Sequence, residues 1–152
     1  QGVQVVHLTG KGKDQEVRDA VKAAGVADRW HVIDYLSTME DALAVADLVV
    51  CRSGAGTVAE MTALGLPCVY VPLPIGNGEQ KLNAADHVAQ GGALLVADQD
   101  LTSDYVRGTI FPLPGSEKLS EMAIASRALA HPDGAQQLAD LIESTLQKKD
   151  QK

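Results

Sequence analysis

Long hydrophobic runs, cysteines and clusters of basic residues are all scarce in this sequence of 152 residues. A membrane-spanning helix needs about 18 to 20 consecutive apolar residues, and no run in the chain approaches that length. The sequence also begins without the pattern of a signal peptide. These absences predict a cytoplasmic chain that has no transmembrane segment.

The two cysteines, Cys51 and Cys68, both lie inside apolar runs. That context is typical of reduced thiols in the core of a cytosolic protein, and it does not resemble a disulfide framework. With 45% hydrophobic residues, a chain of this length can bury a core without disulfides or metals. We therefore expect a single domain over residues 1–152.

Positive charge is scarce too, with 13 Lys and Arg against 20 Asp and Glu and a net charge of −7. The chain lacks any block of five or six basic residues, which argues against nucleic acid as a partner. The four histidines show neither H-x-x-x-H spacing nor a nearby C-x-x-C pair, so we expect neither a metal site nor a cofactor. They are His7, His31, His87 and His131.

Short apolar runs alternate with helical patterns along most of the chain. Strands are predicted at residues 3–9, 30–35, 47–52, 67–73 and 92–98. Helices are predicted between them at 14–25, 38–46, 57–65 and 79–92, and the remainder is helical, at 116–130 and 133–147. Because most of the strands are apolar throughout, they fit a parallel sheet covered on both faces. The pattern predicts an α/β fold with a Rossmann-like, doubly wound parallel sheet and C-terminal helices.

A glycine-rich turn, Ser53-Gly54-Ala55-Gly56, follows the strand that ends near Cys51. Ligands of such sheets bind at the carboxyl ends of strands, and a helix beginning at Thr57 would offer unpaired N–H groups to an anion. A second interpretation stays open, because Thr57 and Glu60 also have the spacing of a capping box.

Other nucleotide and catalytic motifs fit poorly. Gly54 to Ala59 matches the G-x-G-x-x-[GA] dinucleotide fingerprint, but the next strand ends in VPLPIGN without the expected acidic residue. The GKGK segment at 10–13 lacks the spacing of a phosphate-binding loop. Ser53 is not in a G-x-S-x-G motif, so we assign no catalytic residue to this chain.

The longer segment CRSGAGTVAEMTALGLP, followed by QKLNA, resembles the nucleotide-sugar motif of GT-B glycosyltransferases. The resemblance is closer to the bacterial family that transfers N-acetylglucosamine to lipid I in peptidoglycan synthesis. The segments HLTGKG and HPDGAQQLADLI fit that family's C-terminal half in the same order, so the resemblance extends over essentially the whole chain. It implies the donor-binding domain of an inverting hexosyltransferase, with UDP-N-acetylglucosamine as donor.

The resemblance also implies roles for individual residues around the turn. Ala55, Gly56 and Thr57 would contact the diphosphate through backbone N–H groups and the Thr57 hydroxyl. Glu60 would accept hydrogen bonds from the two ribose hydroxyls.

Further roles follow outside the turn. Gln80 and Asn83 would present amides to the sugar, although both could be ordinary polar residues of a helix start. Leu36 would lie where the family's backbone reads the uracil edge, or it could be a core residue. Arg52 could neutralise a phosphate or pair with a surface carboxylate. Glu79 stands where relatives often carry His or Gln, so it puts a carboxylate near an anionic donor.

The family's N-terminal half, with the lipid I site, the membrane-facing apolar patch and the candidate base, has no counterpart in this chain. We therefore expect the isolated chain to be inactive and the full-length protein to be peripheral on the cytoplasmic face of the membrane. Two alternatives remain open at this point. One is another GT-B enzyme, a glycolipid glycosyltransferase or a nucleotide-sugar epimerase; the other is a non-enzymatic domain that binds a nucleotide or a protein.

Overall fold

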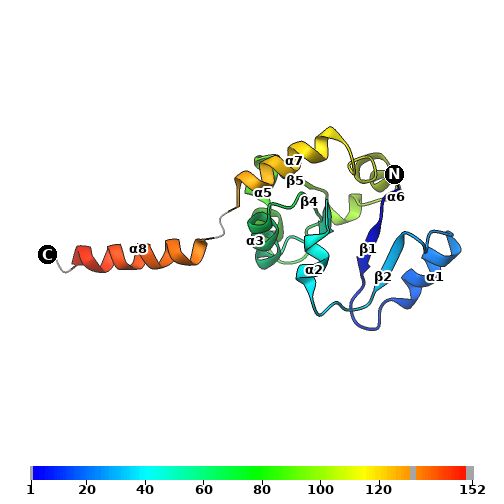
Figure 1. Cartoon of the computed structure of the whole chain (residues 1–152), viewed down its shortest axis with the longest axis horizontal. Helices are drawn as coiled ribbons and strands as arrows, with labels where there is room; N and C mark the ends of the chain where they lie inside the picture. Colours follow the sequence, from blue (N-terminus) through cyan, green and yellow to red (C-terminus); the bar gives the residue numbers. More distant parts are fainter. Residues whose placement is uncertain (1, 131–132, 150–152) are drawn as a thin grey trace. The chain divides into compact units, whose positions relative to one another are not determined.

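The computed structural model describes residues 2–130 and 133–149 (Figure 1). The chain forms two compact units, Gln1–Asp47 and Leu48–Lys152. His131, one of the scattered histidines, lies outside the described residues. Within the described part, none of the helices is long and apolar enough to cross a membrane.

The first unit is a pair of parallel strands, each followed by a helix. Its elements are β1 (Val5–Leu8), α1 (Gln15–Ala23), β2 (Trp30–Ile33) and α2 (Met39–Ala44). Strands β1 and β2 pair in parallel, with Val5 opposite Trp30. Val21 of α1 and Val32 of β2 are buried, because the crossover helix covers the strand to which it leads. The strand predicted at 30–35 ends at Ile33, so Tyr35 and Leu36 lie in the loop after it.

The second unit contains a three-stranded parallel sheet in the order β3-β4-β5. Its first elements are β3 (Val49–Cys51), α3 (Ala55–Leu64), β4 (Cys68–Tyr70), α4 (Glu79–Asn83), α5 (Ala85–Ala89) and β5 (Ala93–Leu95). The central strand β4 is fully buried, since its residues 68 to 70 are all 0% exposed. A parallel sheet with helices between its strands confirms the predicted α/β fold.

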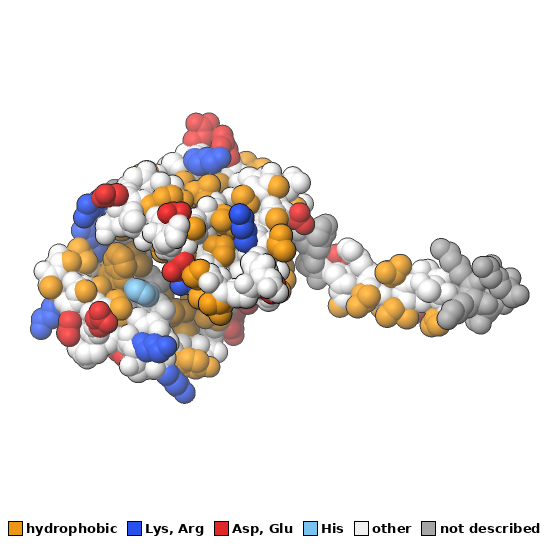
Figure 2. Space-filling model, turned by 180° about the vertical axis from the view of Figure 1, so that it is seen from behind, with side chains coloured by type: hydrophobic (Ala, Val, Ile, Leu, Met, Phe, Trp, Pro, Cys, Tyr) orange, Lys and Arg blue, Asp and Glu red, His pale blue; other side chains and the backbone are white. Residues whose placement is uncertain are grey.

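The rest of the second unit is helical, as predicted. It comprises η1 (Asp98–Asp100), α6 (Ser103–Tyr105), the π-helical η2 (Val106–Ile110), α7 (Glu117–Ala128) and α8 (Gly134–Lys149). The core joins these helices to the sheet, because Ile110, Leu113 and Met122 pack with Val69 and Val71. Helix α8 carries exposed apolar side chains along one edge (Figure 2), at Leu138, Leu141, Ile142 and Leu146.

All five predicted strands are present, each shorter than expected. The helix predicted at 79–92 is divided at Ala84, which ends α4 and precedes α5. The helix predicted to begin at Thr57 begins at Ala55. Because of this earlier start, Ala55 and Gly56 of the glycine-rich turn belong to the first turn of the helix.

Candidate functional site

The carboxyl ends of β3, β4 and β5 meet at one edge of the sheet in the second unit, because all three strands are parallel. The loop after β3 leads into α3, and the loop after β4 leads into α4. Seven of the eight predicted binding residues lie on these two loops and helices. In α/β sheets this edge is where ligands bind.

The N-terminus of α3 is open and has no side-chain cap. Gly54 is the N-cap residue, with φ −63° and ψ 150°, and no side chain hydrogen-bonds to this end of the helix. The first turn contains no acidic residue, so nothing in it neutralises the positive end of the helix dipole. Ala55 and Gly56 are exposed here, and their N–H groups have no partner within the helix.

The capping-box interpretation is therefore wrong. Because Gly54 adopts the extended N-cap conformation, the helix starts two residues earlier than predicted and Thr57 lies inside its first turn. Glu60 then lies in the second turn, too far along to return to the first N–H groups. The side chain of Glu60 is exposed, and Thr57 and Glu60 are left without the structural role that the sequence offered them.

The glycines of this turn are not demanded by the fold. A Cβ atom built at Gly56 would meet nothing within 4 Å, and one at Gly54 would meet only the Thr57 hydroxyl oxygen, at 4.0 Å. Gly65 differs, since its φ is +66° and a Cβ there would lie 2.7 Å from Cγ of Arg127. A glycine inside a helix costs about 0.5 to 1 kcal/mol relative to alanine. The open space at Gly56 therefore leaves room for a ligand to approach the backbone closely.

Ser53 occupies a position that no sequence motif singles out. Its side chain is 0% exposed. Among the buried side-chain oxygens and nitrogens of the described residues, the Ser53 hydroxyl oxygen is the one that has no hydrogen-bond partner. Burying a polar group without a partner lowers the folding stability by about 1 to 3 kcal/mol. Ser53 lies immediately before the N-cap of α3, and only its exclusion from G-x-S-x-G was visible in the sequence.

Arg52 joins the ends of the three strands. Its Nη1 donates to the carbonyl oxygens of Val71 and Pro72, at 3.1 and 3.4 Å. The same nitrogen pairs with the carboxylate of Asp98, beyond β5, at 2.5 Å. Both side chains are partly exposed, so the pair contributes little stability. Of the two roles left open for Arg52, the structure shows the carboxylate pair, and a phosphate contact stays a prediction.

The amides of Gln80 and Asn83 are both oriented by backbone groups. The Leu73 N–H donates to Oε1 of Gln80 at 3.0 Å, and Nδ2 of Asn83 donates to the Ser53 carbonyl at 3.1 Å. These partners fix which end of each amide faces the protein, because a backbone N–H can only donate and a carbonyl can only accept. Gln80 thus keeps its NH₂ group, and Asn83 its Oδ1, for another partner.

Glu79 has a structural role in the loop before α4. Its Oε2 accepts a hydrogen bond from the Asn77 N–H at 3.0 Å. A Cβ at Gly76 would lie 2.6 Å from the same oxygen, and Gly76 has φ +73°. The carboxylate is therefore held over its own loop, which explains why an acidic residue follows the sequence Gly76-Asn77-Gly78.

Leu36 belongs to the first unit and is half-buried in the loop that follows β2. Its neighbour Tyr35 is 61% exposed, and the Tyr35 N–H donates to the Asp34 carboxylate at 2.8 Å. Nζ of Lys11 lies 4.9 Å from the centre of the Tyr35 ring. The backbone of this loop follows a strand end, as the sequence predicted.

We expected no carboxylate pair with Asp-x-Asp spacing, an absence that would fit a metal-independent transfer, and this expectation is wrong because Asp98 and Asp100 form such a pair. One carboxylate oxygen of Asp98, Oδ1, is paired with the Arg52 guanidinium. Across the described ranges, no group of three or more His, Cys, Asp or Glu side chains is placed to hold a metal ion.

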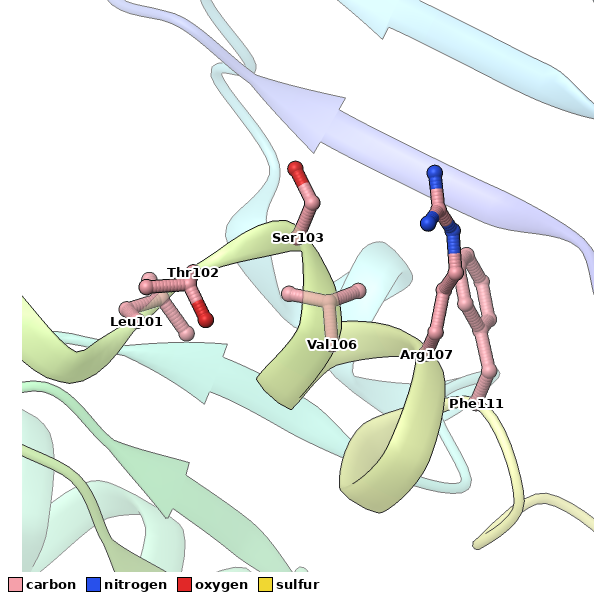
Figure 3. A pocket seen from close by; sticks show the side chains of 6 residues that line it. All are labelled: Leu101, Thr102, Ser103, Val106, Arg107 and Phe111. Carbon is pink, nitrogen blue, oxygen red and sulfur yellow. The ribbon is translucent and has the colours of Figure 1, made fainter.

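A separate hollow lies over α6 and η2 (Figure 3), lined by Leu101, Thr102, Ser103, Val106, Arg107 and Phe111. The hydroxyl of Thr102 caps α6 by accepting from the Tyr105 N–H at 3.2 Å. None of the predicted binding residues contributes to this hollow.

A sequence model of the glycosyltransferase family 28 C-terminal domain matches residues 1–138. The chain is 46% identical over 142 residues to a Paenarthrobacter aurescens protein named UDP-N-acetylglucosamine--N-acetylmuramyl-(pentapeptide) pyrophosphoryl-undecaprenol N-acetylglucosamine transferase. The match covers 93% of this chain and 38% of that protein. A protein of the same name from Mycolicibacterium smegmatis is 47% identical over 141 residues, with coverages of 92% and 36%.

The similar solved structures include MurG and a further glycosyltransferase. The chain is similar to the crystal structure of Acinetobacter baumannii MurG, with a TM-score of 0.79 and 30% identity. That match covers 93% of this chain and 41% of the MurG chain. The glycosyltransferase of kitacinnamycin matches with a TM-score of 0.62 and 26% identity. This chain thus spans well under half the length of the relatives that it matches.

Proposed function

The chain belongs to the glycosyltransferase family 28 C-terminal domain family, and on this basis we propose that residues 1–152 form the donor-binding part of an N-acetylglucosaminyltransferase. The donor is UDP-N-acetylglucosamine, and the full-length protein transfers its sugar to lipid I to make lipid II. The observation that carries the proposal is the open N-terminus of α3, which has a glycine N-cap and no acidic residue in its first turn.

This helix end suits the diphosphate of the donor. The first-turn N–H groups, including those of Ala55 and Gly56, are available to phosphate oxygens, and the helix dipole favours negative charge there. The Thr57 hydroxyl, no longer a candidate cap, is a further donor in the same turn. The room above Gly56 supports close contact between the backbone and the phosphate.

Glu60 is the proposed ribose contact. Its carboxylate is exposed one turn into α3, and it can accept hydrogen bonds from the 2′ and 3′ hydroxyls together. The loop that contains Leu36, in the first unit, is the proposed reader of the uracil edge through its backbone.

The sugar is assigned to the two amides that follow β4. Gln80 offers N–H donors and Asn83 offers an acceptor oxygen, because their other ends are held by Leu73 and Ser53. Sugar hydroxyls both donate and accept, so a donor and an acceptor three residues apart on α4 are complementary to them. The Glu79 carboxylate is bonded to its own loop, which reduces its conflict with an anionic donor.

The proposed reaction is an inverting transfer in which a base removes the proton of the acceptor hydroxyl as that oxygen attacks the anomeric carbon. The bond to the diphosphate breaks, and UDP leaves with the electron pair. This chain's part is to hold the donor and to stabilise the growing negative charge at the N-terminus of α3. The proposal involves no metal or cofactor.

The acceptor site and the base are assigned to a part of the full-length protein outside residues 1–152. We accordingly propose that the isolated chain is inactive and that the full-length protein works on the cytoplasmic face of the membrane. Transfer of labelled N-acetylglucosamine to a lipid I analogue by the purified chain would contradict the assignment of the acceptor site.

Calorimetric titration of the chain with UDP-N-acetylglucosamine, UDP, ADP and NAD tests the donor proposal. We expect binding of both uridine nucleotides and a gain in melting temperature with them, because a ligand that binds only the folded state stabilises it. ADP and NAD are expected to bind much more weakly. Equal binding of UDP and ADP would contradict a uracil-reading loop, and no binding of any nucleotide would contradict the function.

A further inference from the structure

Three buried side chains of the second unit, none of them assigned to contact the donor, are joined by hydrogen bonds. The Tyr70 hydroxyl lies 2.9 Å from Nδ1 of His87, and Nε2 of His87 lies 2.7 Å from the Ser126 hydroxyl. Ser126 in turn donates to the Gly92 carbonyl at 3.1 Å. All three side chains are at most 1% exposed.

The hydrogen bonds determine the state of the histidine. The single proton of the Ser126 hydroxyl is used on the Gly92 carbonyl, so the Ser126 oxygen must accept from Nε2–H of His87. Nδ1 then carries a lone pair and accepts from the Tyr70 hydroxyl. The ring is neutral in this arrangement, and burial lowers the pKa of His87, which keeps it so.

This network attaches α5 to elements on three sides. Tyr70 is on β4, Ser126 is on α7, and Gly92 lies just before β5. The packing leaves no spare room, since a Cβ at Gly92 would lie 2.5 Å from Cδ2 of His87 and 2.6 Å from the Ser126 oxygen. Position 92 therefore has to be glycine for the ring to occupy its place.

The same two segments are joined a second time, near the proposed sugar contacts. Tyr70 of β4 bonds to His87 of α5, and Leu73, three residues after Tyr70, bonds to Gln80 of α4. Helices α4 and α5 meet directly at the fully buried Ala84. The two bonds thus hold the α4–α5 segment against β4 and its loop at both ends.

We propose that His87 is a positioning residue for the donor sugar: by fixing α5, it fixes the placement of Gln80 and Asn83 on α4. The inference rests on the proposed function, because it concerns the side chains assigned there to the sugar. None of the hydrogen-bonded groups of the network lies on α3, which carries the proposed diphosphate and ribose contacts. His87 therefore affects recognition of the sugar more than recognition of UDP.

Ser126→Ala tests this inference, with Ser116→Ala as its matched control. Both variants remove a serine hydroxyl, Ser116→Ala at the N-cap of α7 and Ser126→Ala near its C-terminal end. Ser116 caps the N-terminus of α7, where its hydroxyl accepts from the Leu119 N–H at 3.2 Å, and it has no link to His87. Ser126→Ala instead leaves Nε2–H of His87 and the Gly92 carbonyl without their partner. Tyr70→Phe, which removes the hydroxyl at the other ring nitrogen, serves as a second test variant.

Titration of each variant with UDP and with UDP-N-acetylglucosamine gives the decisive comparison. We expect Ser126→Ala and Tyr70→Phe to lose about 3- to 10-fold in affinity for the nucleotide sugar, the range for one neutral hydrogen bond, and little for UDP. Ser116→Ala should lower the melting temperature and leave both affinities unchanged.

Two results would overturn the inference while the proposed function stands. One is an equal loss for both ligands in Ser126→Ala, which would mean a general effect on the fold. The other is unchanged affinity for the nucleotide sugar in both Ser126→Ala and Tyr70→Phe. Absence of UDP binding by the unaltered chain is a different outcome, and it would overturn the proposed function together with the inference.

Discussion

Gln80 is joined to Leu73 by a hydrogen bond in which the backbone N–H of Leu73 donates to Oε1 at 3.0 Å. This bond consumes the acceptor end of the side-chain amide and directs its NH₂ group away from the loop backbone. Gln80 therefore has a structural contact at its oxygen, and its NH₂ group is left for the proposed contact with the sugar.

The Gln80→Glu variant separates these two contacts. A carboxylate oxygen can accept from the Leu73 N–H at least as well as an amide oxygen does, so we expect the melting temperature to change little. The variant has no N–H donor for a sugar and adds a negative charge near the donor phosphates. Affinity for UDP-N-acetylglucosamine should fall about tenfold, and affinity for UDP should fall less.

Isothermal titration with both ligands measures the effect of this variant. Gln90→Glu, which makes the same change at an exposed position at the end of α5, controls for the added charge. A loss in Gln90→Glu equal to that in Gln80→Glu would mean that the sugar does not contact Gln80.

Gly56→Ala should increase stability and decrease binding. The position is helical and a Cβ meets nothing within 4 Å, so alanine should stabilise the chain by up to about 0.5 to 1 kcal/mol. The added methyl group fills the space proposed for the diphosphate, and affinity for UDP should fall about tenfold or more.

Urea unfolding and titration with UDP measure the two effects of Gly56→Ala separately. Gly108→Ala is the control, because Gly108 is also in a helical segment and also has open space at its Cβ position. A stabilised Gly56→Ala variant with unaltered affinity for UDP would show that the open space does not receive the diphosphate.

The sequence was sufficient for the order and type of most elements. Apolar runs such as Cys68–Tyr70, bounded by glycine and proline, are buried in the fold. Their apolar character alone indicates strands covered on both faces, so the parallel strands were predicted correctly. The start of α3 was not, because Gly54 can be either a turn residue or an N-cap. The extended conformation that it adopts moved the helix start to Ala55 and removed the capping box.

The side-chain partners at the site could not be predicted from spacing. Asn83 bonds to the carbonyl of Ser53, 30 positions earlier, and that pairing depends on the fold having brought α4 beside the loop after β3. His87 looked like one of four scattered histidines, since its partner Ser126 is 39 positions away. The resemblance to a family supplied roles for Gln80 and Asn83 but gave no indication of the groups that orient them.

Acid should destabilise the chain through His87. Burial lowers the pKa of His87 in the folded state, and its ring nitrogens face the neutral hydroxyls of Tyr70 and Ser126. Burial also raises the pKa of Tyr70, which therefore stays protonated. As the pH falls below about 6.5, the unfolded chain binds a proton that the folded chain resists. The free energy of unfolding should then decrease until the pH reaches the lowered pKa.

Urea unfolding at pH 7.5 and pH 5.5 measures this effect in the unaltered chain and in His87→Gln. Glutamine does not titrate but retains an N–H group that can donate toward Ser126, so the variant should lose less stability on acidification. The other histidines are common to both proteins, and their contribution cancels in the comparison. An equal loss in the two proteins would mean that the titration of His87 does not contribute.

The start of α3 at Ala55 leaves Glu60 without a capping role, so Glu60→Gln should change the melting temperature little. If the carboxylate accepts from both ribose hydroxyls, the variant should bind UDP more weakly by about 1.5 to 3 kcal/mol, which is about tenfold or more in affinity. Its affinity for 2′,3′-dideoxy-UDP should change much less, because that ligand has no ribose diol. Glu143→Gln, the same change at an exposed position of α8, controls for the lost charge. Equal losses for the two ligands, or no loss for either, would show that the ribose is bound by another residue.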